Sequence, residues 1–492
     1  MRILFISGLV FILFLLISCS TQESKPNFVF FLIDDLGWND LGCYGSSFYE
    51  TPNVDKLASE GIRFTNAYAA CPVCSPTRAS IMTGKYPAGM YTTDWFGAPQ
   101  PETTKNHWTR NKPLLPASYN EYLALEEVTI AETLKEAGYT TFFAGKWHLG
   151  YDSVYWPENQ GFDINIGGYS RGAPNKNTTH MTNGYFAPYG NPRLEDGPEG
   201  EYLPERLANE TINFIEKHKS ESFFAFFSMY SVHTPLQTTG ILIDKYEAKK
   251  QKLGLEDEWG QISSTNKWRL IQSHPVYAGM VEAMDNAVGT VLQKLEELEL
   301  ADNTIIIFMS DNGGLATSEG HPTTNLPLRA GKGWMYEGGI REPMIIKWPC
   351  KFQPGIENHP VISNDFYPTI LEMAGLPLKP EQHTGGKSMV PLLEKRDFER
   401  GSLYWHYPHW GNQGGSPSSA IREGDWKLIE WHIDKSVELY NLKEDVGENN
   451  NLAETNPKKA NELLIKLNSW RNSENVKYPS LNPDYSIEFE NY

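Results

Sequence analysis

The chain has 492 residues, of which 40% are hydrophobic, so it can bury a large core and is not a disordered protein. Its 43 basic and 61 acidic residues leave a net charge of −18, which repels polyanions, and we expect no nucleic-acid partner. Five cysteines in a chain of this length do not make a disulfide scaffold.

The N-terminal segment reads as an export signal. Arg2 precedes an apolar run over residues 3–17, which is too short for a comfortable membrane span. The run ends in Leu16-Ile-Ser-Cys19, which resembles a bacterial lipobox, so residues 1–18 are predicted to be a lipoprotein signal peptide with lipidation at Cys19. A plain secretory signal is the alternative. We expect a Gram-negative bacterial protein that is exported to the periplasm or anchored to the outer membrane through its lipid.

Five apolar runs predict strands that are buried on both faces, as in the parallel sheets of α/β proteins. They are Asn27–Ile33, Thr140–Ala144, Phe223–Tyr230, Thr304–Met309 and Met344–Trp348. Helices are predicted between them: Thr129 and Glu132 have the spacing of a capping box, and the longest helix is predicted over 276–300. This alternation predicts an α/β fold with a mostly parallel central sheet flanked by helices.

The pattern changes after about residue 380. Short strands are predicted over 402–405, 419–422, 426–431 and 437–440, before a final helix with Asn456 as N-cap and Pro457 at its first position. We therefore expect one large domain over residues 26–380 and a smaller C-terminal α+β domain over 381–492. Two long loops, 86–126 and 167–201, have the length of functional loops.

Polar side chains follow four of the five predicted strands directly. They are Asp34 and Asp35, Lys146 and His148, His233, and Asp311 and Asn312. Any one of these clusters alone is most simply a turn or a helix cap. Because ligands bind outside the carboxyl ends of strands in open α/β sheets, the four together predict a single pocket. Asp34, Asp35, Asp311 and Asn312 offer only oxygen ligands, which suit calcium or magnesium better than zinc or copper.

The segment Cys71-Pro-Val-Cys-Ser-Pro-Thr-Arg78 predicts a helix with Ser75 as N-cap and Pro76 as its first residue. Cys74 would then lie at a helix N-terminus, which favours anions, and Arg78 would project from the same face. The residues alone allow three interpretations of Cys71 and Cys74: a redox pair, a structural disulfide or a buried thiol. A cysteine phosphatase loop needs its arginine six residues after the cysteine, whereas Arg78 is four after Cys74 and seven after Cys71.

The run Cys74-Ser-Pro-Thr-Arg-Ala-Ser-Ile-Met-Thr-Gly84 resembles the signature of the formylglycine-dependent sulfatases, which belong to the alkaline phosphatase superfamily. In that family a separate formylglycine-generating enzyme oxidises the first residue of Cys-x-Pro-x-Arg. The resemblance extends from about Phe28 to Tyr440. Other family-like motifs occur in order at 33–37, 138–150, 232–235, 310–314, 331–332 and 337–343.

The resemblance implies roles for these residues. Asp34, Asp35, Asp311, Asn312 and the oxidised Cys74 (3-oxoalanine) would hold one calcium ion. Arg78 would orient the formylglycine, while Lys146, His233 and Lys332 would hold the sulfate. An aldehyde hydrate supplies two hydroxyls on one carbon, one to attack sulfur and one to expel sulfate once His148 takes its proton, with His233 protonating the leaving oxygen. Histidine suits both transfers because its ordinary pKa is about 6.5.

The substrate is less constrained. The chain resembles bacterial polysaccharide-degrading sulfatases, so we expect exo-acting hydrolysis of sulfate esters on oligosaccharides from algal polysaccharides, such as ulvan or carrageenan, or from glycosaminoglycans. Candidate sugar contacts are Asp94 and Trp95, Tyr169 and Arg171, and His406 and His409 within the aromatic segment 404–410; a core strand is the alternative for that segment. The alternative functions are a phosphomonoester or phosphonate hydrolase, which usually carries Thr or Ser as nucleophile, and a non-catalytic glycan-binding lipoprotein.

Overall fold

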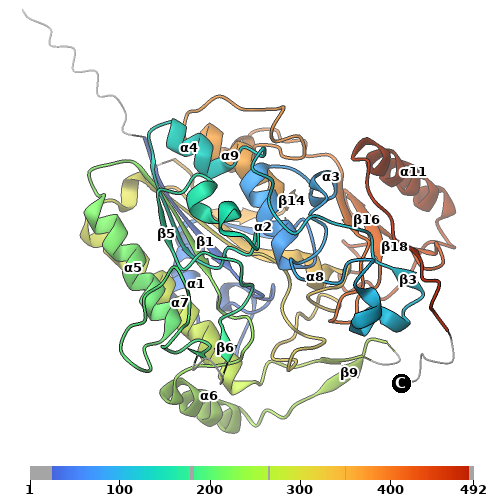
Figure 1. Cartoon of the computed structure of the whole chain (residues 1–492), viewed down its shortest axis with the longest axis horizontal. Helices are drawn as coiled ribbons and strands as arrows, with labels where there is room; N and C mark the ends of the chain where they lie inside the picture. The colour runs from blue at the N-terminus through green and yellow to red at the C-terminus, as the bar shows by residue number, and fades with distance from the viewer. Residues whose placement is uncertain (1–24, 178–181, 264–265, 350, 487–492) are drawn as a thin grey trace, which may run out of the picture.

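The computed structural model describes residues 25–177, 182–263, 266–349 and 351–486, and its centre is a nine-stranded sheet with helices on both faces (Figure 1). The predicted signal peptide and Cys19 lie outside the described residues. Within the described part, no helix has the length and apolar character needed to cross a membrane.

The five predicted strands all belong to the central sheet. They are β1 (Asn27–Ile33), β4 (Thr140–Gly145), β8 (Phe223–Met229), β11 (Thr304–Ser310) and β12 (Arg341–Lys347). The strand order is β13-β2-β12-β11-β1-β8-β4-β5, with β14 also paired to β2. Only the two pairs made by β12 are antiparallel, so the prediction of a mostly parallel sheet is confirmed.

Four strands of this sheet did not appear among the sequence predictions. They are β2 (Ile62–Tyr68), β5 (Ile164–Ile166), β13 (Gly355–Glu357) and β14 (Val361–Ile362). Most are very short, and β2 carries polar residues that are half-exposed between buried ones. Neither kind of strand forms a continuous apolar run, which was the signal used for the others.

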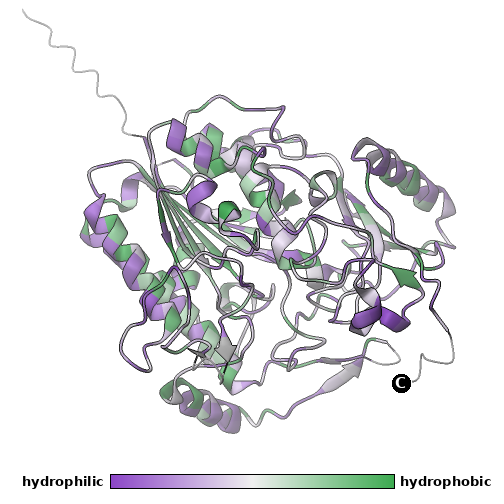
Figure 2. Ribbon diagram, in the orientation of Figure 1, coloured by the Kyte–Doolittle hydropathy of each residue, from purple (hydrophilic) through white to green (hydrophobic). Residues whose placement is uncertain are grey.

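The sheet separates two hydrophobic cores because successive side chains of a strand point to opposite faces. In β1, Val29, Phe31 and Ile33 belong to one core, and Phe28, Phe30 and Leu32 belong to the other. Figure 2 shows these strands as a hydrophobic layer between helices that are hydrophobic on one side only. Both faces of the central strands are therefore buried.

The helices divide between these cores. On the first face lie α1 (Pro52–Glu60), α5 (Leu203–Lys217), α6 (Gly240–Leu253) and the long α7 (Pro275–Glu297). On the second lie α2 (Cys74–Thr83), α4 (Ile130–Glu136), α9 (Phe366–Met373) and α10 (Val390–Leu393). The predicted capping box is present at α4, where the Thr129 hydroxyl accepts from the N–H of Glu132 and the Glu132 carboxylate accepts from the N–H of Thr129.

A four-stranded antiparallel sheet forms the C-terminal part, as expected. Its strands are β15 (Leu403–Tyr407), β16 (Ser418–Glu423), β17 (Trp426–Trp431) and β18 (Val437–Asn441), and α11 (Pro457–Ser473) packs against them. The remaining short elements are α3 (Pro87–Met90), α8 (Glu337–Ile340), the pair β9 (Trp259–Gln261) and β10 (Lys267–Arg269), the pair β3 (Leu114–Leu115) and β19 (Ser480–Leu481), the pair β6 (Lys176–Asn177) and β7 (Thr182–Asn183), and the 3₁₀ turns 42–44, 104–106, 108–111, 153–155, 157–159, 301–303 and 363–365.

A buried ionic contact fastens this small sheet to the large one. Lys427 of β17 lies 3.0 Å from Glu337 of α8 and 2.8 Å from Glu448, and all three side chains are fully buried. Since a buried charge is costly without its partner, this contact fixes α8 and the segment that precedes it.

Candidate active site

Cys74 begins helix α2 at the edge of the sheet where the parallel strands end. The helix starts two residues earlier than predicted, and the position before it is Val73 in an extended conformation. Ser75 is therefore not the N-cap; its hydroxyl accepts instead from the backbone N–H of Phe96 at 3.2 Å. The helix ends at Gly84, whose φ of 71° is left-handed, as the glycine there predicted.

The Cys74 thiol is buried and reduced. Cys43, Cys71 and Cys74 are all free in the described part of the chain, so the structure contains no disulfide in the Cys71-x-x-Cys74 segment. Burial raises the pKa of the Cys74 thiol, although Lys146 and Lys332 lie close enough to oppose the shift. An unmodified Cys74 is thus a weak nucleophile, because the thiolate is the reactive form.

Arg78 lies one turn after Cys74 and joins α2 to three strands of the sheet. Its Nε and Nη2 each lie 2.8 Å from Oδ2 of Asp311, which follows β11. Its Nη1 donates to the Lys146 carbonyl after β4 and to the Ser228 hydroxyl in β8, both at 2.7 Å. The guanidinium is only 2% exposed, so these bonds fix its position.

Asp34 and Asp35 follow β1, and each pairs with a buried lysine. The Nζ of Lys146 lies 2.8 Å from both carboxylate oxygens of Asp34. The Nζ of Lys332 lies 2.7 Å and 2.8 Å from the two oxygens of Asp35. The φ of Asp35 is 59°, so the extended conformation of β1 stops there and the second carboxylate is not directed to the opposite face.

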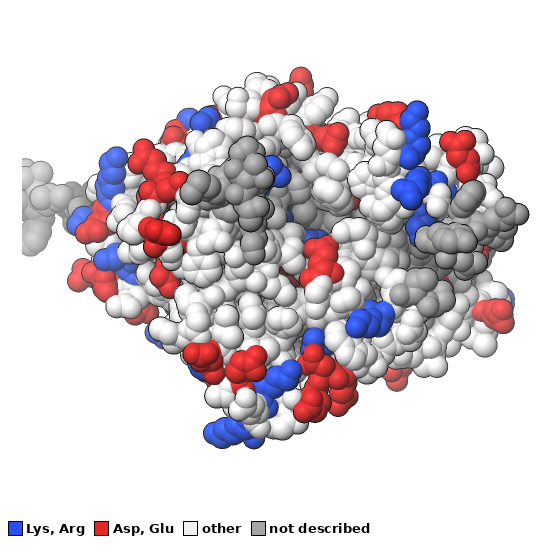
Figure 3. Space-filling model, turned by 60° about the horizontal axis from the view of Figure 1, so that its bottom comes forward, with Lys and Arg blue, Asp and Glu red and all other residues white. Residues whose placement is uncertain are grey.

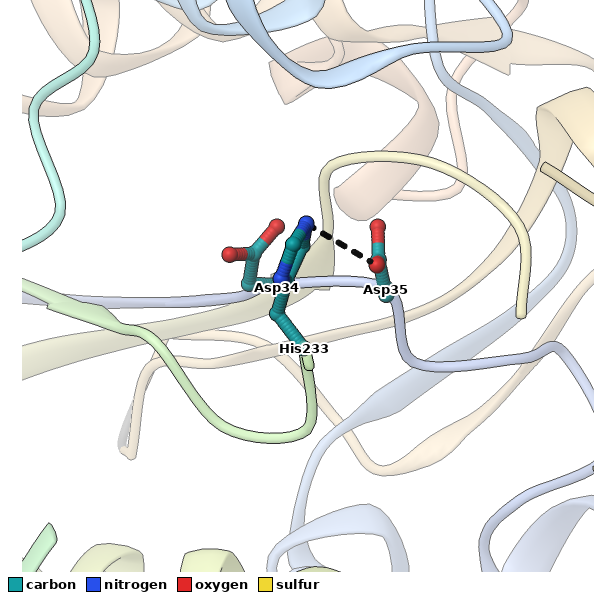
Figure 4. A group of neighbouring side chains, drawn as sticks. All are labelled: Asp34, Asp35 and His233. Atoms are coloured by element: carbon teal, nitrogen blue, oxygen red, sulfur yellow. Dashed lines mark ion pairs between the residues drawn. The ribbon is translucent and has the colours of Figure 1, made fainter. Parts of the chain in front are cut away.

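His233 stands beside the two aspartates, and Figure 4 shows its ring close to both carboxylates. Its Nε2 lies 3.5 Å from Oδ2 of Asp35, and one ligand atom from each of Asp34, Asp35 and His233 falls within 4.8 Å of the others. Its Nδ1 lies 2.7 Å from the Thr234 carbonyl, which can only accept, so Nδ1 carries a proton and Nε2 faces the cluster.

Three carboxylates and three cations thus form one buried cluster with no net formal charge. Burial raises the pKa of Asp34 to about 6, with Lys146 opposing the shift. Burial acts in the same direction on Asp35, but Lys332 and His233 overcome it and hold the pKa of Asp35 well below its usual range. Burial disfavours the charge on Lys332, but the Asp35 carboxylate outweighs this and raises the pKa of Lys332. At pH 7 both carboxylates are ionised.

The residues of this cluster fit a hard divalent cation. The amide of Asn312 donates from Nδ2 to Asp35 at 2.8 Å and to the Gly313 carbonyl at 3.1 Å, which fixes its orientation. Its Oδ1 is then a buried acceptor without a hydrogen-bond donor among the described residues. A buried polar atom in that state is costly unless a ligand satisfies it. Together with the carboxylates it makes an all-oxygen donor set, which calcium and magnesium prefer.

His148 lies directly beside Cys74. Its Nδ1 is 3.4 Å from Sγ of Cys74, and its Nε2 is 3.0 Å from the Phe96 carbonyl. Because a carbonyl only accepts, Nε2 carries the proton and Nδ1 presents a lone pair to residue 74. Burial and the positive charge of Lys146 lower the pKa of His148 well below its usual value, so the imidazole is neutral. It is therefore placed and protonated as a base.

These groups open into a cavity of about 660 Å³. Cys74, His148, His233 and Lys332 line its inner end. Its outer wall comes from the long loops, the C-terminal part and two shorter connections that carry Tyr151 and Glu319; the other residues are Trp95, Arg171, Pro174, Asn412 and Gln413. On the molecular face shown in Figure 3, acidic and basic side chains are interspersed among uncharged ones and form no continuous basic field. The cationic groups of the site are inside, as the acidic composition requires.

Of the predicted sugar contacts, only Arg171 and Trp95 line this cavity. Asp94, Tyr169, His406 and His409 are buried and absent from its wall, which corrects the expectation that they contact the sugar. His406 binds the Ser419 hydroxyl at 2.7 Å and the Lys477 carbonyl at 2.8 Å, and burial lowers its pKa to about 4.

His409 and Asp94 have an indirect role. His409 lies 2.8 Å from the Thr93 hydroxyl, and Asp94 accepts from the hydroxyl of Tyr407 at 3.2 Å. These contacts tie the loop that carries Trp95 and Phe96 to strand β15. They therefore position the pocket wall without reaching the substrate.

Several residues of the site did not appear among the sequence predictions. Ser228 is the polar residue inside the apolar run 223–230, a signal that was readable. The Phe96 carbonyl has no sequence signal, because any residue supplies one. Gly172 packs against His148: a Cβ there would lie 2.4 Å from Cε1 of the ring. Glu319, held by the Gln413 amide at 2.7 Å, lies in the loop between Asn312 and Lys332.

Comparisons with known proteins agree with this geometry. A family model described as "Sulfatase" matches residues 26–376, and one described as "N-sulphoglucosamine sulphohydrolase, C-terminal" matches 330–473. A protein named sulfatase from Formosa agariphila is 32% identical over 94% of this chain and 95% of its own length. Human N-acetylgalactosamine-6-sulfatase is 31% identical over 78% of this chain and 69% of its own. The crystal structure of Ps i-CgsB in complex with k-i-k-neocarrahexaose superposes with a TM-score of 0.73 at 28% identity, over 95% of this chain and 96% of that one.

Proposed function

The chain belongs to the sulfatase family and is a sulfuric ester hydrolase, and we propose that it removes sulfate from a carbohydrate by means of a formylglycine made from Cys74. The observation that carries this proposal is the position of Cys74, 3.4 Å from a neutral His148 and in the same cavity as Lys332 and His233. The relatives support the carbohydrate: one is named for N-acetylgalactosamine-6-sulfate chemistry, and another was solved with a neocarrahexaose.

Asp34, Asp35, Asp311 and Asn312 would hold one calcium ion, and the modified residue 74 would lie beside it. The buried Oδ1 of Asn312 supports this assignment, since it has no donor among the described residues. A bound divalent cation supplies positive charge that polarises the sulfate ester. The amide in place of a fourth carboxylate keeps the negative charge of the donor set low enough to admit an anionic substrate.

A formylglycine-generating enzyme would oxidise Cys74 during maturation. The hydrate of the resulting aldehyde supplies two hydroxyls on one carbon, one to attack sulfur and one whose deprotonation allows sulfate to leave. The lone pair of His148 Nδ1 faces residue 74 and can accept that proton, because the Phe96 carbonyl keeps the ring proton on Nε2. This is general base catalysis by a group within hydrogen-bond reach.

Three cations stabilise the charge on sulfate. Arg78 and Lys146 lie 3.9 Å and 2.8 Å from the Asp34 carboxylate, and Lys332 lines the cavity itself. Such fixed charges act most strongly where water is excluded, and all three side chains are buried. His233 also lines the cavity, and among the described residues its Nε2 makes no hydrogen bond to the backbone. This nitrogen would donate a proton to the leaving oxygen.

The cavity supports exo action on a chain end. Its volume of about 660 Å³ lies within the range of small-molecule sites, and long loops form its outer wall. Arg171 is exposed on that wall and has no ion pair in the described part of the chain, so it would pair with a second anionic group of the sugar. We infer an oligosaccharide fragment of an algal polysaccharide, such as ulvan or carrageenan, or of a glycosaminoglycan.

We also propose that the protein is exported and anchored through a lipid on Cys19, on the strength of the lipobox-like sequence alone. Metabolic labelling with a fatty acid should mark the wild-type protein and leave Cys19→Ala unmarked and released from membranes. Equal membrane association of the two proteins contradicts the anchor and favours the plain secretory signal.

The experiment that tests the function is a release assay over defined esters. Enzyme produced with a formylglycine-generating enzyme is mixed with sulfated mono- and oligosaccharides, including galactose, N-acetylgalactosamine and rhamnose sulfates, and free sulfate is measured. We expect release from at least one sugar sulfate and none from Cys74→Ala at equal thermal stability. Faster cleavage of phosphate or phosphonate esters would favour the other hydrolases of the superfamily, and binding without release would favour a glycan-binding protein.

A further inference from the structure

A second cavity of about 560 Å³ lies next to the catalytic one, and its walls are aromatic. Trp108, Trp334, Tyr336, Trp410 and Trp431 line it. We call this cavity the aromatic groove. The mechanism above uses none of these residues, and Trp108 has 40% of its surface exposed. Trp431 is partly exposed, whereas Trp334, Tyr336 and Trp410 are at most 9% exposed and are set back in the wall of the groove.

The aromatic groove adjoins the catalytic cavity. Asn412 lines both cavities and is exposed between them. The stretch 332–334 borders both cavities, because Lys332 lines the catalytic cavity and Trp334 lines the groove. The loop with Gly415 closes tightly on this stretch, since a Cβ at Gly415 would lie 1.7 Å from the Gly333 carbonyl oxygen. A sugar chain that extends from the catalytic cavity over Asn412 would therefore reach the groove.

The aromatic rings of the groove are held in place. The indole N–H of Trp334 donates to the Gln413 carbonyl at 2.9 Å, and that of Trp410 donates to the Leu114 carbonyl at 2.9 Å. Tyr336 packs against both of its neighbours, stacked on Trp334 at 6.1 Å and tilted against Trp431 at 5.8 Å between ring centroids. Rigid rings present apolar faces at a low entropic cost, which suits the C–H faces of sugar rings.

The groove also carries a cation without a counter-ion. The Nζ of Lys112 lies 5.0 Å from the centroid of the Trp410 ring, and the described part of the chain provides no carboxylate partner for it. The acidic residue of the groove, Asp434, is bonded to the backbone N–H and hydroxyl of Ser436. Lys112 is therefore available for a sulfate or carboxylate on a sugar residue.

We propose that the aromatic groove binds the sugar residues that continue from the sulfated residue in the catalytic cavity, as a subsite for a sulfated oligosaccharide. The proposal rests on the proposed function, because it takes its occupant from the adjacency of the two cavities, which share Asn412 as a lining residue. It predicts that affinity grows with chain length and that this gain depends on Trp108, Trp431 and Lys112.

The kinetic test compares oligosaccharides of two, four and six residues with an aryl sulfate that contains no sugar. The oligosaccharides come from the glycan that the release assay selects. For the wild type we expect kcat/KM to rise about tenfold with length through a lower KM, as stacking on one or two rings allows. Trp108→Ala and Trp431→Ala should lose this rise relative to the aryl sulfate. Trp348→Ala is the matched control and should keep it, since Trp348 lies with Lys25 and Pro26 at the opposite edge of the sheet.

A binding test separates this proposal from the proposed function. Calorimetry with the Cys74→Ala protein needs no turnover, and the probes are hexasaccharides from carrageenan, ulvan and chondroitin sulfate. We expect one of these hexasaccharides to bind, and its affinity to fall at least tenfold in the Trp431→Ala variant. The Lys112→Ala variant should no longer prefer the sulfated hexasaccharide over its chemically desulfated form. If the enzyme releases no sulfate but this pattern holds, only the proposed function is wrong. Binding by none of the probes, or equal binding by the variants, overturns the subsite.

Discussion

Gly172 is the position where the smallest change should disturb catalysis most directly. The Cβ of an alanine there would lie 2.4 Å, 2.6 Å and 2.8 Å from Cε1, Nδ1 and Nε2 of His148. Ordinary contacts of a Cβ begin at 3.4 Å, so the ring has to move by 3.4 − 2.4 = 1.0 Å. It cannot do so freely, because the Phe96 carbonyl and Cys74 hold its two nitrogens.

A displacement of about 1 Å costs on the order of 100-fold in rate, or about 2.7 kcal/mol of activation free energy. We therefore expect Gly172→Ala to lower kcat by about 100-fold with a much smaller change in KM. The three atoms nearest to such a Cβ all belong to His148 and none to the substrate-binding cations Lys332 and Arg78, so sulfate binding should persist. The assay is steady-state sulfate release with the fraction of formylglycine matched between proteins.

Gly240→Ala is the matched control, because a Cβ at Gly240 meets no atom within 4 Å. It should keep wild-type kcat. If Gly172→Ala also keeps wild-type kcat at equal formylglycine content, the position of the His148 ring does not matter and its assignment as the base is wrong. A rise in KM alone would equally contradict the reasoning, because it would make Gly172 a substrate-binding position.

Three further outcomes follow from the site and its surroundings. Arg78→Ala leaves the buried Asp311 carboxylate unpaired and should lower the free energy of unfolding by about 3–5 kcal/mol, whereas Arg78→Lys should lower it by about 1–3 kcal/mol. Urea denaturation measures both losses, and an unchanged free energy of unfolding would refute the role of Arg78 in this network. Chelation should stop sulfate release and added calcium should restore it, with Asn312→Ala needing more calcium; indifference to the chelator counts against the cation. Burial raises the pKa of Asp40 from 3.8 to about 6, so its stabilising contribution is complete below pH 4 and is lost as the pH rises through 6. Between pH 4 and pH 8 the free energy of unfolding of Asp40→Asn should therefore rise by about 3 kcal/mol relative to that of the wild type. A difference between the two proteins that does not change with pH would refute this.

The sequence predicted the strands of the central sheet that are long and buried on both faces. In β1 and β8 every residue is buried, and an unbroken apolar run is the direct consequence. The strand β2 was not predicted because its residues Arg63, Thr65 and Asn66 are only half-buried, close to the end of the sheet. The same physical rule therefore explains both the success and the omission.

The sequence also indicated which polar residues meet, because strand ends of a parallel sheet share one edge. Asp34, Lys146, His233 and Asp311 do lie together there, although they are almost 280 positions apart. What it could not supply was the finer chemistry. The tautomer of His148 depends on the backbone carbonyl of Phe96, and the Ser75 hydroxyl accepts from the backbone N–H of the same residue, which a long loop contributes.

The sugar contacts were the weakest inference for a similar reason. His406 lies directly opposite Ser419 in the pairing of β15 with β16, so its polar atoms are satisfied within the C-terminal sheet. The sequence pattern of a polar residue in an aromatic segment is the same whether its side chain contacts a ligand or a neighbouring strand. The residues of the aromatic groove could not be predicted as a group, because its aromatic residues are spread from Trp108 to Trp431 along the chain and only the fold brings them together.

The most direct test of the account is the mass of the peptide that contains Cys74, taken from enzyme preparations of graded activity. The account predicts that a fraction of this peptide carries an aldehyde in place of the thiol group and that sulfate release is proportional to that fraction. Full activity in a preparation whose Cys74 is entirely unmodified thiol would contradict it.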